Sequence, residues 1–201
     1  LFHIIFFAAM LLVTVYLCVF RKADSADRVR KVVFAVSLIV ILLEVYKMIN
    51  YSFSYDSGKI TYDFQWYAFP FQFCSTPMYV GLLAGLIKKG KVHDALCAYL
   101  ATFAIFAGLC VMVYPGDVFI GTIGINIQTM ICHGTMLPIG AYLLATGHVK
   151  LEHKTILKAL CVFAVTVGVA MILNEVAHMS GLLNRESFNM FYISPYQDPP
   201  L

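Results

Sequence analysis

Long apolar stretches separated by short polar segments dominate the chain. Each stretch contains few or no charged residues and is long enough to cross a hydrocarbon core of ~30 Å, which takes roughly 20 helical residues. Only a helix satisfies all of its backbone hydrogen bonds within one such segment. We therefore predict an all-α membrane helix bundle of about six transmembrane helices, over residues 2–20, 32–51, 66–87, 95–114, 119–146 and 156–179.

The composition also places the chain in a lipid environment. Hydrophobic residues make up 61% of the 201 residues and charged residues only 12%, and the mean hydropathy is +0.82. These values are typical of a membrane protein. The loops are short and no segment repeats another, so we expect a single transmembrane domain over residues 1–201. The first apolar segment lacks the flanks of a signal peptide, and a seventh helix can follow Leu201.

Basic residues are concentrated in alternate loops. Because short loops rich in Lys and Arg stay in the cytoplasm, we predict that loops 21–31, 88–94 and 147–155 are cytoplasmic and that the N-terminus lies outside. Orientation and anionic lipid headgroups explain these charges, so we expect no nucleic-acid partner. The cations are Arg21, Lys22, Arg28, Arg30 and Lys31, then Lys88, Lys89 and Lys91, then Lys150, Lys154 and Lys158.

Three charged or reactive side chains within the predicted helices lie at one depth. At ~1.5 Å of rise per residue, Glu44, Cys74 and His133 all lie roughly 18–21 Å above the cytoplasmic boundary. Charged groups inside a bilayer normally face a partner or a cavity. We therefore predict a polar pocket that opens to the non-cytoplasmic side.

Further polar residues lie at or above this depth and are candidates for binding or orienting a substrate. Glu44 and Lys47 are one helical turn apart and can form an ion pair. A purely structural pair that holds helices together explains them equally well. The other candidates are His3, Gln72, Asn126, Asn174, Glu175 and His178.

Cys74 and His133 each lie near a proline that interrupts helical hydrogen bonding. Pro77 lacks the N–H that would bond the carbonyl of Phe73, and Pro138 leaves a carbonyl free in the same way. Membrane helices tolerate such interruptions where a cavity or a neighbour satisfies the backbone. We expect a distorted turn beside each residue, and such turns can shape a pocket.

A cysteine and a histidine at one depth suggest nucleophilic catalysis. The thiolate is the attacking form of cysteine, so His133 can serve as the base for Cys74. Glu44 or Glu175 can orient the imidazole as a third member. The serine and threonine after Cys74 are competing nucleophiles, although hydroxyls need stronger activation. Hydrogen bonding between helices is the alternative explanation of all these polar groups.

The sequence does not favour a disulfide framework or a metal site. All six cysteines fall inside apolar segments without a CxxC pair, so we expect neither a disulfide framework nor a zinc ribbon. The residues His3, His133, His178 and Glu175 are possible zinc ligands, but they lack the local spacing of a metal motif. We predict no metal and no other cofactor.

A resemblance to a known family rests on His133 and on residues 69–77, which read Phe-Pro-Phe-Gln-Phe-Cys-Ser-Thr-Pro. Here the chain resembles the YwaF-like family of integral membrane proteins, which includes transmembrane protein 164, and the similarity covers most of the chain. Family members tend to carry a Leu-Pro-hydrophobic-His/Gln-hydrophobic-Cys element in one helix and a His roughly two helices later. Two features differ, because the family often has His in place of Gln72 and usually continues into a seventh helix.

The resemblance implies a membrane acyltransferase that moves an acyl chain between a phospholipid and a lysolipid. It implies that Cys74 is the nucleophile and His133 the base, with membrane lipids as the substrates and partners. The sequence alone leaves two other classes open. One is a six-helix protein that binds or transports a small ligand in an outward-facing polar pocket. The other is a structural membrane protein, and no feature indicates an oligomeric state.

Overall fold

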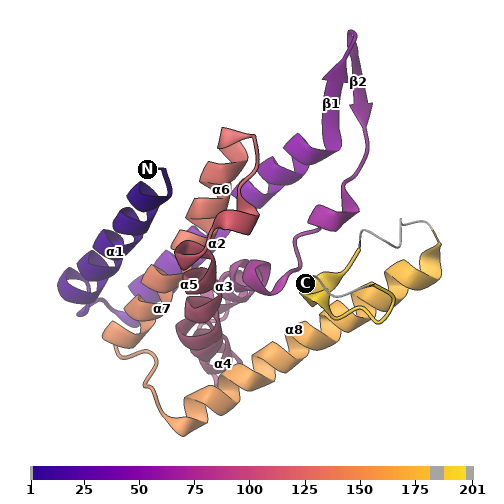
Figure 1. Cartoon of the computed structure of the whole chain (residues 1–201). Coiled ribbons are helices and arrows are strands. Elements are labelled where there is room, and N and C mark those ends of the chain that lie inside the picture. The colour runs from indigo at the N-terminus through magenta and orange to yellow at the C-terminus, as the bar shows by residue number, and fades with distance from the viewer. Residues whose placement is uncertain (1, 182–187, 198–201) are drawn as a thin grey trace.

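The computed structural model describes residues 2–181 and 188–197 of the chain. Helices form most of it, and a β-hairpin projects from one end (Figure 1). Within the described residues, four helices are long and apolar enough to cross a membrane. They are α1 (Phe2–Phe20), α2 (Ala26–Ser52), the composite helix Lys91–Val113 and α8 (His153–Ser180).

The composite helix contains a change of helical geometry. It consists of α4 (Lys91–Tyr99), a π-helical turn η3 (Leu100–Ala104) and α5 (Ile105–Val113). A π turn adds a residue to one helical turn, and such turns are frequent at functional sites. It also changes the rotation of α5 relative to α4.

The third predicted span differs most from expectation. Residues 66–72 contain only the short turn η1 (Trp66–Ala68), and the helix proper comprises η2 (Phe73–Ser75) and α3 (Thr76–Leu86). The rise of the 11 residues of α3 is about 16 Å, roughly half of a hydrocarbon core. The helix predicted over 66–87 is therefore wrong before Phe73. Pro77 occupies the first turn of α3, where a residue without an N–H costs no hydrogen bond within the helix.

The fifth predicted span is broken into two helices, α6 (Ile123–Gly134) and α7 (Met136–Ala145). The break at Thr135 follows from Pro138, which cannot donate to the carbonyl of Gly134. The Thr135 hydroxyl donates to the Cys132 carbonyl over 3.1 Å. The backbone is thus irregular beside both Cys74 and His133, as the prolines predict.

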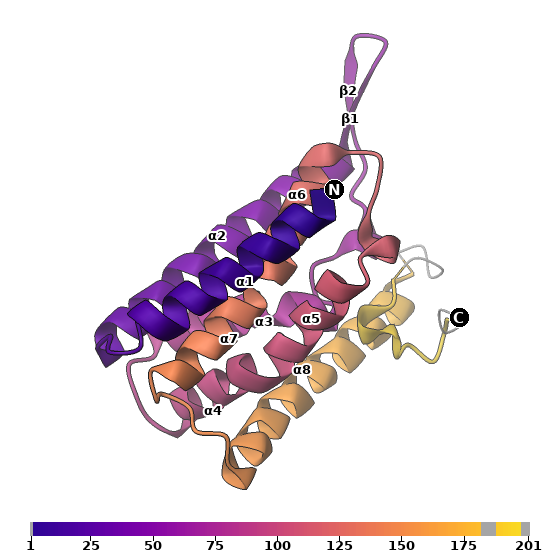
Figure 2. The same cartoon turned by 60° about the vertical axis from the view of Figure 1, so that its left-hand side comes forward.

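A β-hairpin that the sequence analysis did not predict follows α2. Strands β1 (Phe53–Asp56) and β2 (Lys59–Tyr62) pair in antiparallel register. Ser57 and Gly58 form the two-residue turn, both with positive φ, as the favoured hairpin turns require. The hairpin projects from the end of the bundle where the N-terminus lies (Figures 1 and 2).

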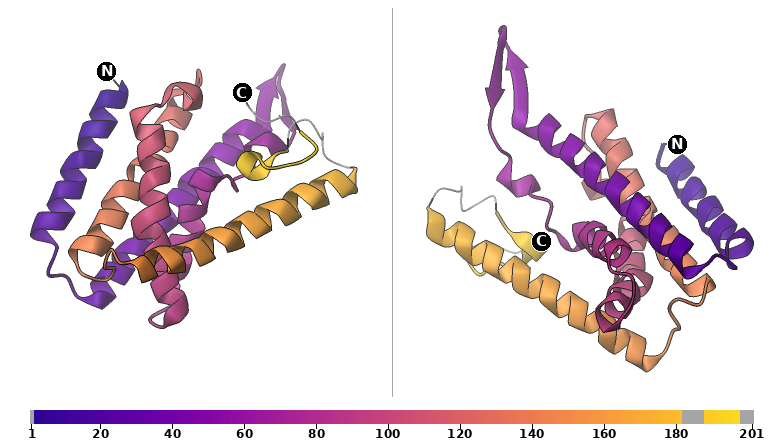
Figure 3. Two further views of the ribbon diagram at one scale, coloured as in Figure 1. Left: turned by 60° about the horizontal axis from the view of Figure 1, so that its bottom comes forward. Right: turned by 180° about the vertical axis from the view of Figure 1, so that it is seen from behind.

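The helices pack as neighbouring pairs. Helix α1 contacts α7 and α6, α2 lies against α3, and α4 against α8. Figure 3 shows α8 crossing one side of the bundle and α1 lying at the other. Large apolar side chains such as Leu12, Leu42 and Ile172 point outward from α1, α2 and α8. Outward apolar faces of this kind are what a membrane-embedded bundle presents to lipid.

The three basic loops lie at the opposite end from the hairpin (Figure 1). Asp24, in the loop after α1, accepts a hydrogen bond of 2.6 Å from Tyr142 near the end of α7. Arg30 donates to the carbonyl of Gly85 at the end of α3 over 2.6 Å. The loops that we expect in the cytoplasm are therefore held together at one end. Their sidedness stays a prediction, and a seventh helix beyond Leu201 lies outside the described residues.

Close approach of α2 and α3 depends on a glycine. A Cβ atom added to Gly85 would lie 2.4 Å from the Phe34 Cβ and 2.7 Å from its Cα. We expect Gly85→Ala to lower the free energy of unfolding in detergent by about 1–3 kcal/mol, since the backbones would have to separate. Gly168→Ala is the matched control, because nothing lies within 4 Å of its added Cβ. Equal unfolding temperatures for the two variants would contradict this packing.

The loop network around Asp24 predicts a pH dependence. The hydrogen bond from Tyr142 lowers the pKa of the Asp24 carboxyl, with further lowering by Arg21 and Arg28, against the opposing effect of burial. A depressed folded-state pKa stabilises the fold above the unfolded value of ~3.9 and loses that effect as the pH falls through the folded value. The thermal unfolding temperature should therefore decrease when the pH is lowered below about 4.

The control for this prediction uses two substitutions of the same kind. Asp24→Asn should flatten the fall in unfolding temperature between neutral pH and acid. Asp56→Asn, at the exposed tip of the hairpin, should keep the slope of the wild type. A wild-type slope in Asp24→Asn would rule out the network as its origin.

Candidate functional site

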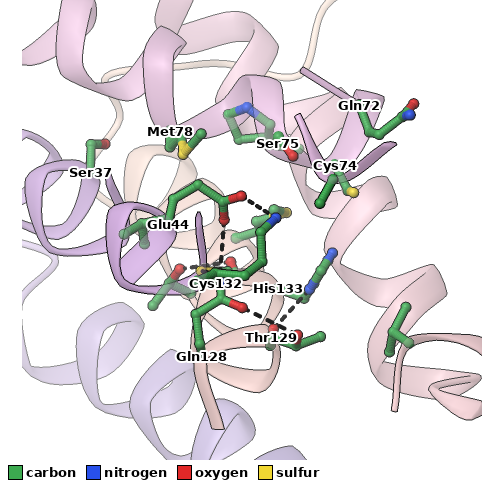
Figure 4. A pocket seen from close by; sticks show the side chains of 18 of the residues that line it. Ser37, Glu44, Gln72, Cys74, Ser75, Met78, Gln128, Thr129, Cys132 and His133 are labelled. Atoms are coloured by element: carbon green, nitrogen blue, oxygen red, sulfur yellow. Dashed lines mark hydrogen bonds and ion pairs between the residues drawn. The ribbon is translucent and has the colours of Figure 1, made fainter. Parts of the chain in front are cut away.

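A cavity of about 360 Å³ lies among α2, α3, the π turn, α6 and α7 (Figure 4). Five of the ten residues singled out from the sequence line it: Glu44, Lys47, Gln72, Cys74 and His133. The structure thus brings together the three residues that the sequence places at one depth. Tyr51, Tyr67 and Ile120 also line the cavity, so it extends toward the hairpin end of the bundle.

Cys74 lies in the short turn that precedes α3. This position is the N-terminal end of a helix, where the helix dipole favours a negative charge such as a thiolate. Thr76 is not available as a competing nucleophile, since its buried hydroxyl bonds the Phe73 carbonyl at 2.8 Å and the Tyr99 hydroxyl at 2.6 Å. Ser75 lines the cavity beside Cys74.

His133 lies in the last turn of α6 with one ring nitrogen occupied. Its Nδ1 is 2.8 Å from the carbonyl oxygen of Thr129, and a carbonyl only accepts, so Nδ1 carries the proton of that bond. The buried Nε2 has no hydrogen-bond partner among the described residues. In a neutral ring Nε2 then holds a free lone pair. In Figure 4 this edge of the ring is turned toward the side of the cavity where Cys74 lies.

Neither of the two candidate carboxylates orients the imidazole. Glu44 forms an ion pair with Lys47 and accepts a hydrogen bond of 2.8 Å from Gln128 Nε2. Glu175 accepts a hydrogen bond of 2.7 Å from the Tyr196 hydroxyl. Neither Glu44 nor Glu175 completes a Cys-His-Glu triad in this structure, because the Thr129 carbonyl already takes the Nδ1 proton of the ring.

Sequence reasoning missed three polar residues of α6 that line the cavity: Gln128, Thr129 and Cys132. Gln128 Nε2 lies 3.2 Å from the Cys132 sulfur, and its Oε1 lies 3.3 Å from the Thr129 hydroxyl. The available signal was the amide of Gln128 inside an apolar segment, since intramembrane polar groups face partners.

Two of the other residues predicted to bind or orient a substrate instead form hydrogen bonds to the backbone of neighbouring segments. His3 bonds the Met112 carbonyl at 2.5 Å and thereby joins α1 to the end of α5. Asn126 bonds both the N–H and the carbonyl of Ile120, at 2.9 and 2.8 Å, which fixes the chain as it enters α6. Neither residue lines the cavity.

Asn174 and Gln72 clamp residues 188–197 with their amide groups. Asn174 bonds the backbone N–H and carbonyl of Met190 at 2.7 and 3.0 Å. Gln72 donates to the Asn189 carbonyl over 2.9 Å and accepts from the Phe191 N–H over 2.7 Å. The clamped segment contains the turn η6 (Met190–Tyr192), and its Tyr192 lines the cavity.

His178, on α8, also contacts this C-terminal segment. Its ring stacks on Tyr196 with centroids 3.5 Å apart, and the Tyr196 hydroxyl bonds Glu175. Within the described residues, no three His, Cys, Asp or Glu side chains are arranged to hold a metal ion. The four possible zinc ligands considered above come from three helices: His3 from α1, His133 from α6, and Glu175 and His178 from α8.

Fold and cavity define a class of protein: a helical membrane protein in which broken helices surround a partly buried polar cavity. The model of the TMEM164 family matches residues 1–200. The chain therefore belongs to the TMEM164 family, and the resemblance seen in the sequence is confirmed. No curated protein and no solved structure matches the chain.

The ion pair in the cavity gives a prediction about stability. The side chains of Lys47 and Glu44 are 16% and 9% exposed, and a buried charge that loses its partner costs about 3–5 kcal/mol. We expect Lys47→Met to lower the free energy of unfolding in detergent by roughly this amount. The double variant with Glu44→Gln should recover most of the loss, because it leaves no unpaired charge. Simple addition of the two single effects would contradict the pairing.

Proposed function

We propose that this chain is a membrane-embedded acyltransferase that moves an acyl chain between a phospholipid and a lysolipid. The observation that carries the proposal is the buried, unpaired Nε2 of His133 in the same cavity as the Cys74 thiol. Nucleophilic acyl transfer needs a base with a free lone pair in the same cavity as the thiol that it activates. Membership of the TMEM164 family is consistent with this function.

The first half-reaction transfers the acyl group to the protein. His133 Nε2 takes the proton of the Cys74 thiol, and the thiolate attacks the ester carbonyl of a phospholipid. The tetrahedral intermediate collapses with cleavage of the ester C–O bond, and the imidazolium returns its proton to the departing lysolipid alkoxide. The product is an acyl thioester on Cys74. Thiol and ring must come within ~2.6–3.2 Å for the proton transfer, a contact that is often looser without substrate.

The second half-reaction reverses these roles. His133 takes the proton from the hydroxyl of an acceptor lysolipid, and the resulting alkoxide attacks the thioester carbonyl. The C–S bond breaks and the imidazolium reprotonates the Cys74 thiolate. The Thr129 carbonyl keeps Nδ1 protonated throughout, so the same ring nitrogen gives and takes each proton.

Other cavity residues have roles in binding. Lys47 is the only Lys or Arg among the described residues that line the cavity, and we expect it to meet the lipid phosphate. Glu44 holds Lys47 in place through their ion pair, and Glu44 is itself held by a hydrogen bond from Gln128. The cavity extends toward the end opposite the basic loops, so the positive-inside rule implies a substrate in the non-cytoplasmic leaflet.

The test is intact-protein mass spectrometry after incubation of the detergent-purified protein with mixed phospholipids. We expect an added acyl mass that hydroxylamine removes, and its absence in Cys74→Ala. His133→Ala should slow its appearance by roughly 10²–10⁴-fold, the usual contribution of a general base. Cys161→Ala is the matched control and should acylate normally, since this exposed thiol lies outside the cavity.

Two results would count against the mechanism. An adduct that persists in Cys74→Ala and resists mild hydroxylamine would indicate that Ser75, and not Cys74, is the nucleophile. No adduct at all, with lipids unchanged after long incubation, would favour the alternative of a small-ligand binding or transport protein. Such a protein needs the polar cavity but no intact thiol.

A further inference from the structure

A second cavity of about 260 Å³ borders the first, on another side of α2. Glu44 and Met78 line both cavities, so these two side chains lie between them. Figure 4 shows both residues at the edge of the first cavity. Whatever occupies the second cavity therefore lies beside the proposed catalytic centre.

The second cavity is an apolar groove along the outer half of α2. Its walls come from one side of α2, from the base of the hairpin, from the segment before α3 and from the first turn of α3. The apolar lining residues are Ile41, Val45, Met48, Ile49, Phe53, Tyr62, Phe64, Pro70, Met78 and Tyr79. The hydroxyl of Tyr79 is taken by the Pro70 carbonyl at 2.9 Å. A groove of this composition accommodates a hydrocarbon chain in preference to a polar ligand.

The length of the groove matches one leaflet. It runs along α2 from Ile41 to Ser52, and these 11 steps of helical rise amount to about 16 Å. Half of a hydrocarbon core is ~15 Å thick. An acyl chain in this groove would thus extend from the membrane surface at the hairpin end to about the middle of the bilayer.

One end of the groove carries a buried polar group that lacks a partner among the described residues. Ser52, 4% exposed, is the last residue of α2, and its buried Oγ has no hydrogen-bond partner among the described residues. A buried hydroxyl without a partner is unfavourable, and an ester carbonyl at the head of an acyl chain would satisfy it. Glu44 is the other polar lining residue, and it is already held by Lys47 and Gln128.

We propose that this groove binds one acyl chain of a glycerolipid from the leaflet at the hairpin end, with the ester carbonyl at Ser52 and the methyl end near Ile41. The inference deepens the proposed function, because it assigns the site that holds a lipid beside the cavity of Cys74. It requires no covalent step of its own.

The experiment uses photoaffinity labelling in the Cys74→Ala background, so that its outcome is independent of catalysis. The protein is placed in phosphatidylcholine vesicles that contain a small fraction of phosphatidylcholine with a diazirine in its acyl chain. After irradiation, peptide mass spectrometry locates the label. A diazirine close to the ester should label Met48 or Ile49, and one close to the methyl end should label Ile41.

Two substitutions on α2 provide a matched pair. Val45→Trp fills the groove and should reduce groove labelling about tenfold, which corresponds to losing the burial of about two methylene groups. Leu42→Trp should leave it unchanged, because Leu42 is equally lipid-facing but lines neither cavity. Ile49→Trp is a second groove-filling variant that should repeat the result of Val45→Trp.

Label spread equally over Leu42 and Val45, or groove labelling that survives both groove-filling variants, would overturn the inference. So would a label position that does not change with the position of the diazirine. Groove labelling together with a failed thioester test would refute the proposed acyl transfer and leave the lipid site standing. An acyl thioester on Cys74 without groove labelling would refute the lipid site and leave the proposed acyl transfer standing.

Discussion

A backbone that is interrupted inside a bilayer must find its hydrogen bonds within the protein, since lipid offers none. Among the described residues, two such interruptions lie before α3 and between α6 and α7. Side chains satisfy the backbone at both: Thr76 bonds the Phe73 carbonyl, Tyr79 bonds that of Pro70, and Thr135 bonds that of Cys132. Both breaks border the same cavity. The position of the cavity, and of Cys74 and His133 within it, follows from where these helices break.

The polar groups of the cavity depend on each other in the same way. Gln128 on α6 donates to Glu44 on α2, which also pairs with Lys47. A buried ion pair of this kind is expensive to leave incomplete. The hydrogen bond from Gln128 ties α6 to α2, and the ion pair within α2 places charged groups on the wall of the cavity. His133 is held by a backbone carbonyl instead, which leaves the charged network separate from the ring nitrogen that we propose as the base.

The C-terminal segment shows how intramembrane polar residues can be structural. Gln72 and Asn174 present the complementary donor and acceptor of an amide to backbone groups of residues 189–191. Each therefore replaces hydrogen bonds that an irregular segment cannot make for itself. The clamps place Tyr192 at the cavity. Four of the residues first considered for substrate binding thus contribute to holding this segment: Gln72, Asn174, Glu175 and His178.

The sequence by itself determined the helical membrane class, the bounds of α1 and the gathering of basic loops at one end, because hydropathy and charge decide which segments leave water. It also predicted one depth for Glu44, Cys74 and His133, because the rise per residue of a helix is constant, and the three residues line one cavity. Tertiary structure decided the rest: the late start of α3, the hairpin, and the partner of each polar group. Such partners lie far apart in the chain, as Gln128 and Glu44 do across 84 positions. Their meeting depends on how each helix is rotated about its axis, and rotation is set by packing against neighbours, as at Gly85 and Phe34.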